Sequence, residues 1–366
     1  MRILILATDA HGGFGGIAQY NCDVIDAMSG FAAVERIVVL PRLIVNPGFE
    51  APYKTHYVRQ ASHGLASFLL CSALEAFRGA TYDLIYCAHI NLLPVAGAIS
   101  RLARCPLVLT IYGEEGWRKP GNWLATTALS SANLIISISQ LTLDRFLDWA
   151  PRLNAETAIV PNAVRAERYA LGAKDQDLVD KYGLAGHRVL MTLGRMDPDE
   201  RAKGFDEIID LMPRLLEHSP DLVYLCAGDG GDRPRLEAKA RFSGVGDKII
   251  FTGRIPESRK ADYFRLADAY VMPSRWEGFG FVILEALACG VPVVASTVDG
   301  TREAVMDGEL GLLADPGNPD DLERAIVEAL RRPKAIPDAL GYFSFANFAK
   351  RLEAALSKVV AIGQSF

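Results

Sequence analysis

Two acidic residues, Glu277 and Glu285, flank the beginning of a helix that the sequence predicts. Glu277 precedes a glycine-rich turn, and Glu285 lies eight residues later in the apolar run 281–288, about two helical turns further on the same side. A helix start offers free backbone N–H groups and a positive dipole end, which suit an anion such as a diphosphate. Two nearby carboxylates suit the hydroxyl groups of a sugar or a ribose. Alternatively, Glu277 only caps the helix and Glu285 is paired in the core.

Two cationic residues lie in another loop that could bind the same anion. Arg195 follows a predicted strand, and Lys203 comes eight residues later, just before a predicted helix. Two such cations could neutralise a departing diphosphate without a metal ion, or they could be ordinary surface residues. Asp197 and Asp199 form a D-x-D sequence between them, but a loop flanked by two cations is a poor divalent metal site. We therefore predict no bound metal.

The first glycine-rich loop, residues 8–16, follows a predicted strand at the amino terminus. Gly13-x-Gly15-x-x-Ala18 matches the letters of a dinucleotide-binding fingerprint, but five residues separate the strand from its first glycine. The next strand ends in proline and arginine, where the fingerprint needs an acid for the ribose. The pattern therefore argues against dinucleotide binding and leaves open a loop that binds no ligand.

Two further strands end in polar residues. Residues 83–89 predict a strand that ends in His89, and residues 106–112 predict one that ends near Tyr112 and Glu114. In α/β proteins, ligands bind outside the carboxyl ends of parallel strands. His89 is therefore a candidate functional residue, although it could also make only structural hydrogen bonds.

Composition narrows the class of protein. The net charge of −5 over 366 residues excludes a protein that is basic enough to bind nucleic acid as a whole. Six scattered cysteines without a C-x-x-C pair indicate small core residues in a reducing compartment. We find no signal peptide, no stretch of about 18 apolar residues that could span a membrane, and no metalloprotease or esterase motif. The first 165 residues carry about +1 and the rest about −6, so the amino-terminal half suits an anionic lipid surface better.

The order of predicted elements indicates the fold. Buried β-branched strands alternate with amphipathic helices from residue 2 to about 165, and the same alternation begins again near residue 187. Such alternation predicts doubly wound parallel sheets, and two of them imply a cleft between two domains. Residues 63–78 predict an amphipathic helix that packs on the first sheet through Leu65, Phe68, Leu69, Ser72 and Ala76, with membrane contact as a minor alternative. Residues 259–270 predict a helix just before the Glu277 turn.

The stretch Glu277-Gly-Phe-Gly-Phe-Val-Ile-Leu-Glu285 resembles the E-x7-E motif of retaining glycosyltransferases of family 4. The neighbouring GVPVVAS, the earlier FTGRIP and the turn Pro161-Asn162-Ala163-Val164 resemble the same family. This resemblance implies the GT-B fold, in which two Rossmann-like domains face a cleft. It also implies that the carboxyl-terminal helix crosses back onto the first domain.

The resemblance assigns roles to individual residues. Glu285 would hold the ribose hydroxyls and Glu277 the sugar hydroxyls, while Arg195 and Lys203 would bind the diphosphate in a long-loop version of the family's G-R-x(n)-K-G sequence. The residues expected at the donor are Gly15, Gly16, Arg195, Lys203, Arg254, Ile255, Glu277, Gly278, Phe279, Gly280, Phe281, Val282 and Glu285. The expected catalytic residues are Glu277, Arg195, Lys203 and His89.

One position departs from the family pattern. Many members have a histidine close to the transferred sugar where this sequence has Tyr112. A phenol can donate a hydrogen bond but is a poor base at neutral pH. The histidine's role therefore passes to His89, or the choice of sugar or acceptor differs. Tyr112, Glu114 and His11 are the candidates on the acceptor side.

These inferences give a domain plan and a function. Residues 1–165 form an acceptor-binding domain, residues 166–344 a nucleotide-sugar-binding domain, and residues 345–366 a helix that packs back on the first domain. We expect a metal-independent hexosyltransferase without a cofactor, with GDP-mannose as the first donor considered and UDP-hexoses as the alternative. The acceptor would be a glycan or a polyprenyl-diphosphate-linked glycan, reached in the cytoplasm or at the cytoplasmic membrane face. A sugar-nucleotide epimerase, a degenerate binding protein of the same architecture and an NAD(P)-dependent oxidoreductase remain as other classes.

Overall fold

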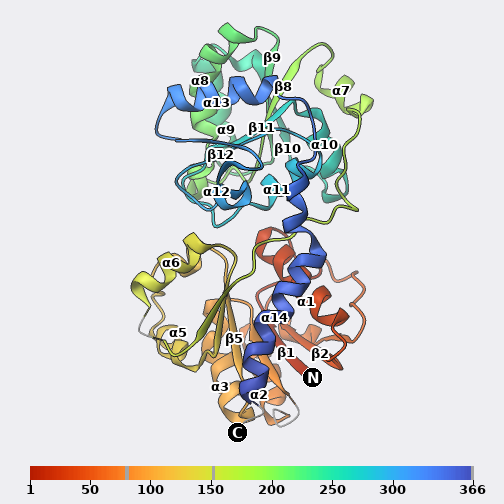
Figure 1. Cartoon of the computed structure of the whole chain (residues 1–366), viewed down its shortest axis with the longest axis vertical. Coiled ribbons are helices and arrows are strands. Elements are labelled where there is room, and N and C mark those ends of the chain that lie inside the picture. Colours follow the sequence, from red (N-terminus) through yellow and green to blue (C-terminus); the bar gives the residue numbers. More distant parts are fainter. Residues whose placement is uncertain (79–81, 151–152, 364–366) are drawn as a thin grey trace. The chain divides into compact units, whose positions relative to one another are not determined.

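The chain folds into two compact units, seen in a computed structural model that describes residues 1–78, 82–150 and 153–363 (Figure 1). The first unit comprises Met1–Ala163 and Phe345–Phe366, and the second comprises Val164–Ser344. Residues 364–366 of the predicted terminal helix lie outside the described part. None of the described helices combines the length and the apolarity that crossing a bilayer would need.

The first unit is built on a parallel sheet of seven strands in the order β3-β2-β1-β4-β5-β6-β7. Every pair of neighbouring strands is parallel. Because parallel neighbours need a crossover connection, helices alternate with these strands along the chain. The strands are β1 (Arg2–Ala7), β2 (Arg36–Pro41), β3 (Thr55–Tyr57), β4 (Leu84–Cys87), β5 (Leu107–Ile111), β6 (Leu134–Ser137) and β7 (Glu156–Ile159).

The helices of the first unit supply these crossovers, and the last helix of the chain joins them. They are α1 (Gly16–Gly30), α2 (Leu65–Phe77), α3 (Leu93–Ala103), α4 (Glu114–Trp117), α5 (Trp123–Ala128), α6 (Gln140–Trp149) and α14 (Phe345–Gly363). Short 3-10 turns lie at η1 (Arg59–Ser62), η3 (Ile90–Leu92) and η4 (Leu129–Ser131). Figure 1 shows α14 beside α1, and the rings of Tyr20 and Phe348 meet edge to face at 5.4 Å. This contact ties the carboxyl terminus to the first unit.

The second unit repeats the plan with a parallel sheet of six strands in the order β10-β9-β8-β11-β12-β13. Its strands are β8 (Arg188–Leu193), β9 (Leu222–Ala227), β10 (Ile249–Gly253), β11 (Ala269–Met272), β12 (Val293–Ser296) and β13 (Leu312–Ala314). Its helices are α7 (Gln176–Tyr182), α8 (Phe205–His218), α9 (Arg233–Phe242), α10 (Lys260–Leu266), α11 (Phe281–Ala288), α12 (Thr301–Ala304) and α13 (Pro319–Arg331). The 3-10 turns are η5 (Pro198–Lys203), η6 (Gly246–Lys248), η7 (Glu257–Arg259), η8 (Met306–Gly308) and η9 (Asp338–Phe343).

Both sheets reverse their strand order at an equivalent place. In the first unit the chain moves outward from β1 through β2 to β3 and then returns to add β4 on the other side of β1. In the second unit β8 and β11 have the same relation. Helices that start from the two central strands then cover opposite faces, which leaves space between the loops at their carboxyl ends. The predicted fold class, two doubly wound parallel sheets, is confirmed.

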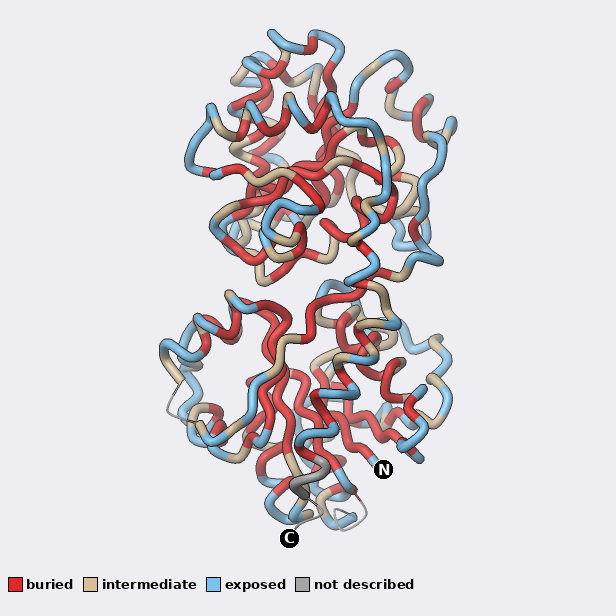
Figure 2. The backbone as a smooth tube through the Cα atoms, in the orientation of Figure 1, coloured by how far each residue is buried: buried red, intermediate tan, exposed pale blue. Residues whose placement is uncertain are grey.

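The strands lie in the interior of each unit. Figure 2 shows the tube buried along the central strands and exposed mainly at loops and outer helix faces. All six residues of β9 and five of the six in β1 are buried. Strands that are covered on both faces read as continuous apolar runs, which is why RILILA and LVYLCA were recognisable in the sequence.

Two expectations about local structure were wrong. The helix predicted over residues 259–270 ends at Leu266, and residues 269–272 form β11 instead. All four residues of β11 are buried beside β8 and β12, so tertiary pairing overrides the apparent helical periodicity.

The packing face predicted for the helix over residues 63–78 was also wrong in part. Phe68 and Ser72 are buried as expected, but Leu65 and Leu69 are exposed, and Cys71 and Glu75 complete the buried face instead. The helix has apolar residues nearly all round, so its periodicity could not fix which face packs on the sheet.

Candidate functional site

The first element of the candidate site is the loop between β11 and α11 at the order reversal of the second sheet. Gly280 precedes α11 with φ of +93°, and no side chain caps the first turn of this helix. A positive φ is easy only for glycine, which explains this residue at the turn. The uncapped N–H groups near Phe281 and Val282 are therefore free to bind an anion.

Glu277 lies in this loop and forms an ion pair with Lys203. The Lys203 ammonium is 3.1 Å from Glu277 Oε2 and 3.4 Å from Glu200 Oε2. Burial lowers the pKa of Lys203, but the two carboxylates outweigh this effect and raise it overall. Lys203 is therefore a positive charge held at the start of α11. The structure thus brings together two predicted site residues that are 74 positions apart in the sequence.

Arg195 joins the same cluster through Glu200. The guanidinium pairs with Glu200, although the Arg195 side chain is 68% exposed. Glu200 thus bridges both predicted diphosphate-binding cations. The sequence analysis missed Glu200, because an acidic residue in an exposed loop carries no signal of its partners.

Asp299 holds the Glu277 loop in place and was also missed. Its carboxylate accepts hydrogen bonds from the Glu277 N–H at 3.0 Å and from the Ser274 hydroxyl at 2.6 Å. Its other oxygen accepts from the Thr301 N–H and hydroxyl at 3.0 and 2.6 Å. Burial raises the pKa of Asp299 to about 6, while the hydrogen bonds from Ser274 and Thr301 oppose this rise.

Close backbone approach explains a glycine beside Asp299. A Cβ on Gly300 would lie 2.1 Å from the Gly278 carbonyl oxygen, and the Gly300 N–H donates to the Glu277 carbonyl at 2.9 Å. The turn after β12 therefore packs directly on the Glu277 loop and fixes its path.

Glu285 lies within α11 and is buried, unlike the partly exposed Glu277. Its carboxylate lies within hydrogen-bonding distance of the Lys260 ammonium and the Tyr169 hydroxyl. Phe279 is also fully buried, and its ring meets Phe343 at 5.6 Å. The side chain of Phe279 therefore anchors the loop, and only its backbone is available to a ligand.

Arg254 and Ile255 follow β10, which is two strands away from β8. They therefore lie along the same carboxyl edge of the sheet as the loop that follows β8. Asp197, the first residue of the D-x-D sequence, accepts a hydrogen bond from the Asp199 N–H at 3.1 Å. Within the described ranges, no group of three or more His, Cys, Asp and Glu side chains is arranged to hold a metal ion.

A second group of predicted residues lies in the first unit, at the carboxyl ends of β1, β4 and β5. Gly15 precedes α1 with φ of +91°, and Gly15 and Gly16 are both exposed. His89 is half-buried after β4, and its Nδ1 accepts from the Asn91 N–H at 3.1 Å. Burial lowers the pKa of His89, although Asp9 opposes this effect. His89 is therefore a neutral imidazole whose proton is on Nε2.

Tyr112 and His11 have intramolecular partners for their polar atoms. The Tyr112 hydroxyl is buried, 2.6 Å from Asn21 Oδ1 and 3.0 Å from the Ala88 carbonyl oxygen. His11 Nδ1 is 2.8 Å from the Tyr57 hydroxyl, and His11 Nε2 is 3.1 Å from an Asp26 oxygen. Glu114 is the exposed first residue of α4. Of the four polar candidates here, His89 and Glu114 are thus the better placed for a ligand.

Residues 176–342 match the family described as glycosyl transferases group 1. A GDP-mannose-dependent alpha-(1-6)-phosphatidylinositol monomannoside mannosyltransferase of Mycolicibacterium smegmatis is 32% identical over 66% of this chain and 65% of its own length. A phosphatidyl-myo-inositol mannosyltransferase of Mycobacterium leprae is 36% identical over 68% of this chain and 64% of its own length. The chain thus spans less than two thirds of the length of these curated relatives.

Solved structures extend the likeness in fold to nearly the whole chain. Anabaena HepE in complex with UDP-glucose superposes with a TM-score of 0.76 and 22% identity, covering 98% of this chain and all of that one. The lipopolysaccharide outer core galactosyltransferase WaaB gives a TM-score of 0.71 at 17% identity, with 98% and 99% covered. These neighbours support the GT-B architecture expected from the sequence.

Asp299 gives a testable dependence of stability on pH. Its folded pKa of about 6 lies above the ordinary value of 3.8, so the folded state binds the proton more tightly than the unfolded state. The stability that this group contributes is present at low pH and is lost as pH rises through about 6. We expect the free energy of unfolding of wild type, relative to Asp299→Asn, to fall by roughly 1 kcal/mol between pH 5.0 and 7.5.

Urea unfolding of both proteins at several pH values measures this difference. Parallel pH profiles for the wild type and the variant would contradict the raised pKa of Asp299.

The motif residues and the shared architecture agree with the match of residues 176–342 to the glycosyl transferases group 1 family.

Proposed function

We propose that this chain is a retaining glycosyltransferase that moves a hexose from a nucleoside diphosphate sugar to a glycan or lipid-linked glycan in polysaccharide biosynthesis. The observation that carries the proposal is the pairing of Lys203 with Glu277 at the uncapped start of α11. A cation, free N–H groups and a carboxylate together suit a diphosphate linked to a sugar. The names of the mannosyltransferase relatives support the same reaction class.

The donor is proposed as GDP-mannose, with a UDP-hexose as the alternative. One relative is named as a GDP-mannose-dependent enzyme, which favours the first. HepE was solved with UDP-glucose, but at 22% identity it supports the fold alone. Binding measurements with GDP and UDP, described below, identify the nucleobase of the donor.

The proposed chemistry depends on charge at the leaving group. When the bond between the sugar and the diphosphate breaks, negative charge builds up on the departing phosphate oxygen. Arg195, Lys203 and the N–H groups from Gly280 to Val282 would stabilise this charge, and Glu277 would hold sugar hydroxyls. This role requires Arg195 and Lys203 to exchange their contacts with Glu200 and Glu277 for contacts with phosphate.

The proton of the acceptor hydroxyl also needs a destination. We propose that the departing phosphate oxygen takes it on the same face of the sugar, because the two described carboxylates of the E-x7-E motif are already paired, Glu277 with Lys203 and Glu285 with Lys260. His89 would then donate a hydrogen bond through Nε2, since its Nδ1 already accepts one. The Tyr112 hydroxyl already donates a hydrogen bond to Asn21. His89 is therefore the better candidate for donating a hydrogen bond to the substrate. Gly15 and Gly16 are proposed to contact the donor phosphates through their backbone.

The reaction is proposed to need neither a metal ion nor a cofactor, because two cations and a helix start supply the positive charge. We propose that the enzyme acts in the cytoplasm and makes peripheral contact with the cytoplasmic face of the membrane, where a lipid-linked acceptor would be found.

The exposed face of α2 supports this membrane contact. Its outward side is apolar, whereas Glu75, its one charged residue, is buried. This is the reverse of an ordinary surface helix. The exposed apolar face consists of Leu65, Leu69, Leu70, Leu74 and Phe77, whose exposed fractions range from 46% to 91%.

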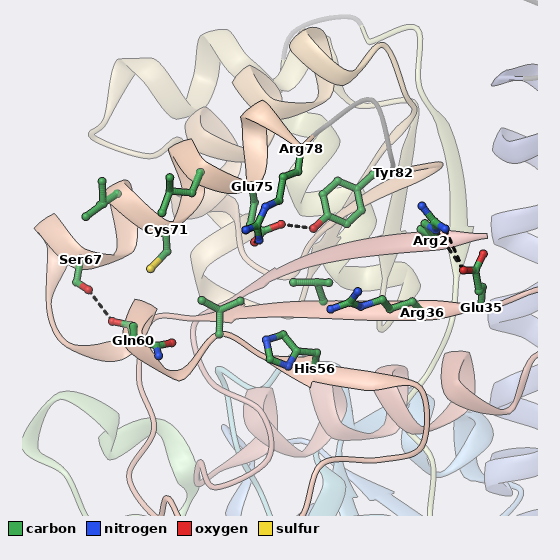
Figure 3. Close-up of a pocket in the computed structure, with 14 residues that line it drawn as sticks. Arg2, Glu35, Arg36, His56, Gln60, Ser67, Cys71, Glu75, Arg78 and Tyr82 are labelled. Carbon is green, nitrogen blue, oxygen red and sulfur yellow. Dashed lines mark hydrogen bonds and ion pairs between the residues drawn. The ribbon is translucent and has the colours of Figure 1, made fainter.

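Positive charge lies next to this apolar face and favours an anionic bilayer as its partner. A hollow of about 540 Å³ is lined by Leu70 and Leu74 together with the arginines in Figure 3, Arg2, Arg36 and Arg78. Glu35 and Glu75 are its acidic residues, and Glu75 is buried. Arg2 pairs with Glu35 and Arg78 pairs with Glu75, so Arg36 supplies the net positive charge beside the leucines, which an anionic headgroup layer would attract.

A panel of ligands tests the donor. The melting temperature is measured with each of five ligands added separately: UDP, GDP, ADP, NAD and NADP. A ligand present at ~100 times its dissociation constant stabilises the folded protein by about 2.7 kcal/mol and raises the melting temperature by a few degrees. We expect a shift with GDP or UDP, since a diphosphate and a ribose are the proposed ligand groups. A shift with NAD or NADP alone would overturn the transferase proposal in favour of an oxidoreductase.

Two substitutions test the proposed charge stabilisation. Lys203→Ala and Glu277→Ala should each lower the rate of transfer at least 100-fold, which corresponds to about 2.7 kcal/mol of transition-state stabilisation. Arg201→Ala is the control, because Arg201 lies in the same loop but pairs with Asp232. Steady-state kinetics with the donor identified above, and circular dichroism for the fold, measure the outcome. Near-normal rates in both variants would refute these roles.

The membrane surface is tested with two matched double variants. Leu74→Ser with Phe77→Ser removes apolar side chains that are 53% and 91% exposed on α2, and Leu171→Ser with Phe242→Ser removes side chains that are 54% and 95% exposed in the second unit. The first pair should weaken binding to phosphatidylglycerol vesicles at least tenfold, because each inserted side chain contributes about 1.5–3 kcal/mol when fully buried. The second pair should leave binding unchanged.

Vesicle co-sedimentation measures both variants and the wild type. Equal binding by both variants, or wild-type binding that is as strong to neutral phosphatidylcholine vesicles, would contradict docking of α2 on an anionic bilayer.

A further inference from the structure

The environment of Glu285 is unusual for a residue proposed to contact a ligand. Its side chain is only 7% exposed and lies in the middle of α11. The Lys260 ammonium is 2.8 Å from Oε1 and 2.7 Å from Oε2. The Tyr169 hydroxyl donates to Oε1 at 2.7 Å. Three separate segments therefore meet at one buried carboxylate.

The charges in this group depend on one another. Burial lowers the pKa of Lys260, but Glu285 and, to a lesser extent, Glu257 raise it above its ordinary value. A buried carboxylate without its ammonium would be costly, so it would take up a proton or rotate toward water. Lys260 thus holds the Glu285 carboxylate in one orientation as its partner in a buried ion pair.

The two oxygens of Glu285 are not equivalent. Oε1 accepts hydrogen bonds from both Lys260 and Tyr169. Oε2 is buried, and its partner among the described residues is the Lys260 ammonium at 2.7 Å. A carboxylate oxygen has two lone pairs, so the single ammonium leaves Oε2 able to accept one more hydrogen bond, whereas Oε1 already has two donors. A hydroxyl donor from a ligand would satisfy Oε2.

We propose that Lys260, together with Tyr169, is a positioning residue that turns Glu285 Oε2 toward one hydroxyl of the donor's ribose. This inference rests on the proposed function, in which Glu285 holds the ribose. With Oε1 occupied, the site recognises ribose through a single oxygen whose place is set by Lys260. Lys260 therefore determines how strongly the enzyme distinguishes ribonucleotides from deoxyribonucleotides, without touching the nucleotide itself.

The arrangement separates recognition of the ribose from recognition of the diphosphate. Arg195 and Lys203, proposed for the phosphates, form ion pairs with Glu200 and Glu277, whereas Glu285 pairs with Lys260. Loss of Lys260 should therefore weaken binding of a nucleoside diphosphate but not of inorganic diphosphate. A general loss of structure would weaken both.

Calorimetric titration of Lys260→Met tests the proposal. The probes are whichever of GDP and UDP the wild type binds, its 2′-deoxy and 3′-deoxy forms, and inorganic diphosphate. We expect wild type to bind the ribonucleotide at least tenfold more tightly than one of the deoxy forms. In Lys260→Met, affinity for the ribonucleotide should fall at least tenfold, the preference over the deoxy form should fall below threefold, and affinity for diphosphate should change less than twofold.

Arg259→Met is the matched control, because Arg259 is the adjacent cation and pairs with Asp175 and Asp262 instead of Glu285. It should retain both the affinity and the ribose preference. Tyr169→Phe removes only the hydroxyl and should lower ribonucleotide affinity about threefold to tenfold, so the test stands if Lys260→Met does not fold.

The possible failures are distinct. An unchanged ribose preference in both Lys260→Met and Tyr169→Phe would overturn the positioning role while leaving the proposed function intact. An equal loss for diphosphate and nucleotide would overturn it as well, because the effect would then be on the whole site. Wild type that binds no nucleoside diphosphate would refute the proposed function and, with it, this inference.

Discussion

The pairing of opposite charges at the start of α11 is the interaction on which the candidate site depends. Lys203 and Glu277 each place a charge where water is partly excluded, and each is tolerable there because the other is 3.1 Å away. The same rule applies to the more deeply buried Glu285, whose charge is neutralised by an ion pair with Lys260. These pairs hold charged groups in fixed positions around an uncapped helix start.

The sheet topology determines where such pairs can form. Each unit reverses its strand order beside its first strand, so polar loops gather at the carboxyl ends of β1 and β4 and of β8 and β11. In the second unit, close backbone packing of Gly300 on Gly278 and the hydrogen bonds of Asp299 keep the Glu277 loop rigid. A site that stabilises charge in a transition state needs this rigidity, because flexible dipoles must first reorganise.

The two units are specialised in different ways. The charged clusters lie in the second unit, which also carries the family match over residues 176–342. The first unit presents an exposed apolar face on α2 beside several arginines. This division fits a protein that is proposed to bind a soluble donor with one unit and to meet a membrane-bound acceptor with the other.

The sequence by itself determined the fold class, the family resemblance and most of the charged residues at the site, because these depend on local periodicity and on a motif of contiguous residues. It could not place β11, the packing face of α2, or the partners Glu200, Asp299, Lys260 and Tyr169. Those features depend on contacts between segments up to 116 residues apart, such as Tyr169 with Glu285. Only the tertiary structure decides them, since whether a charge is neutralised depends on what folding brings within about 4 Å of it.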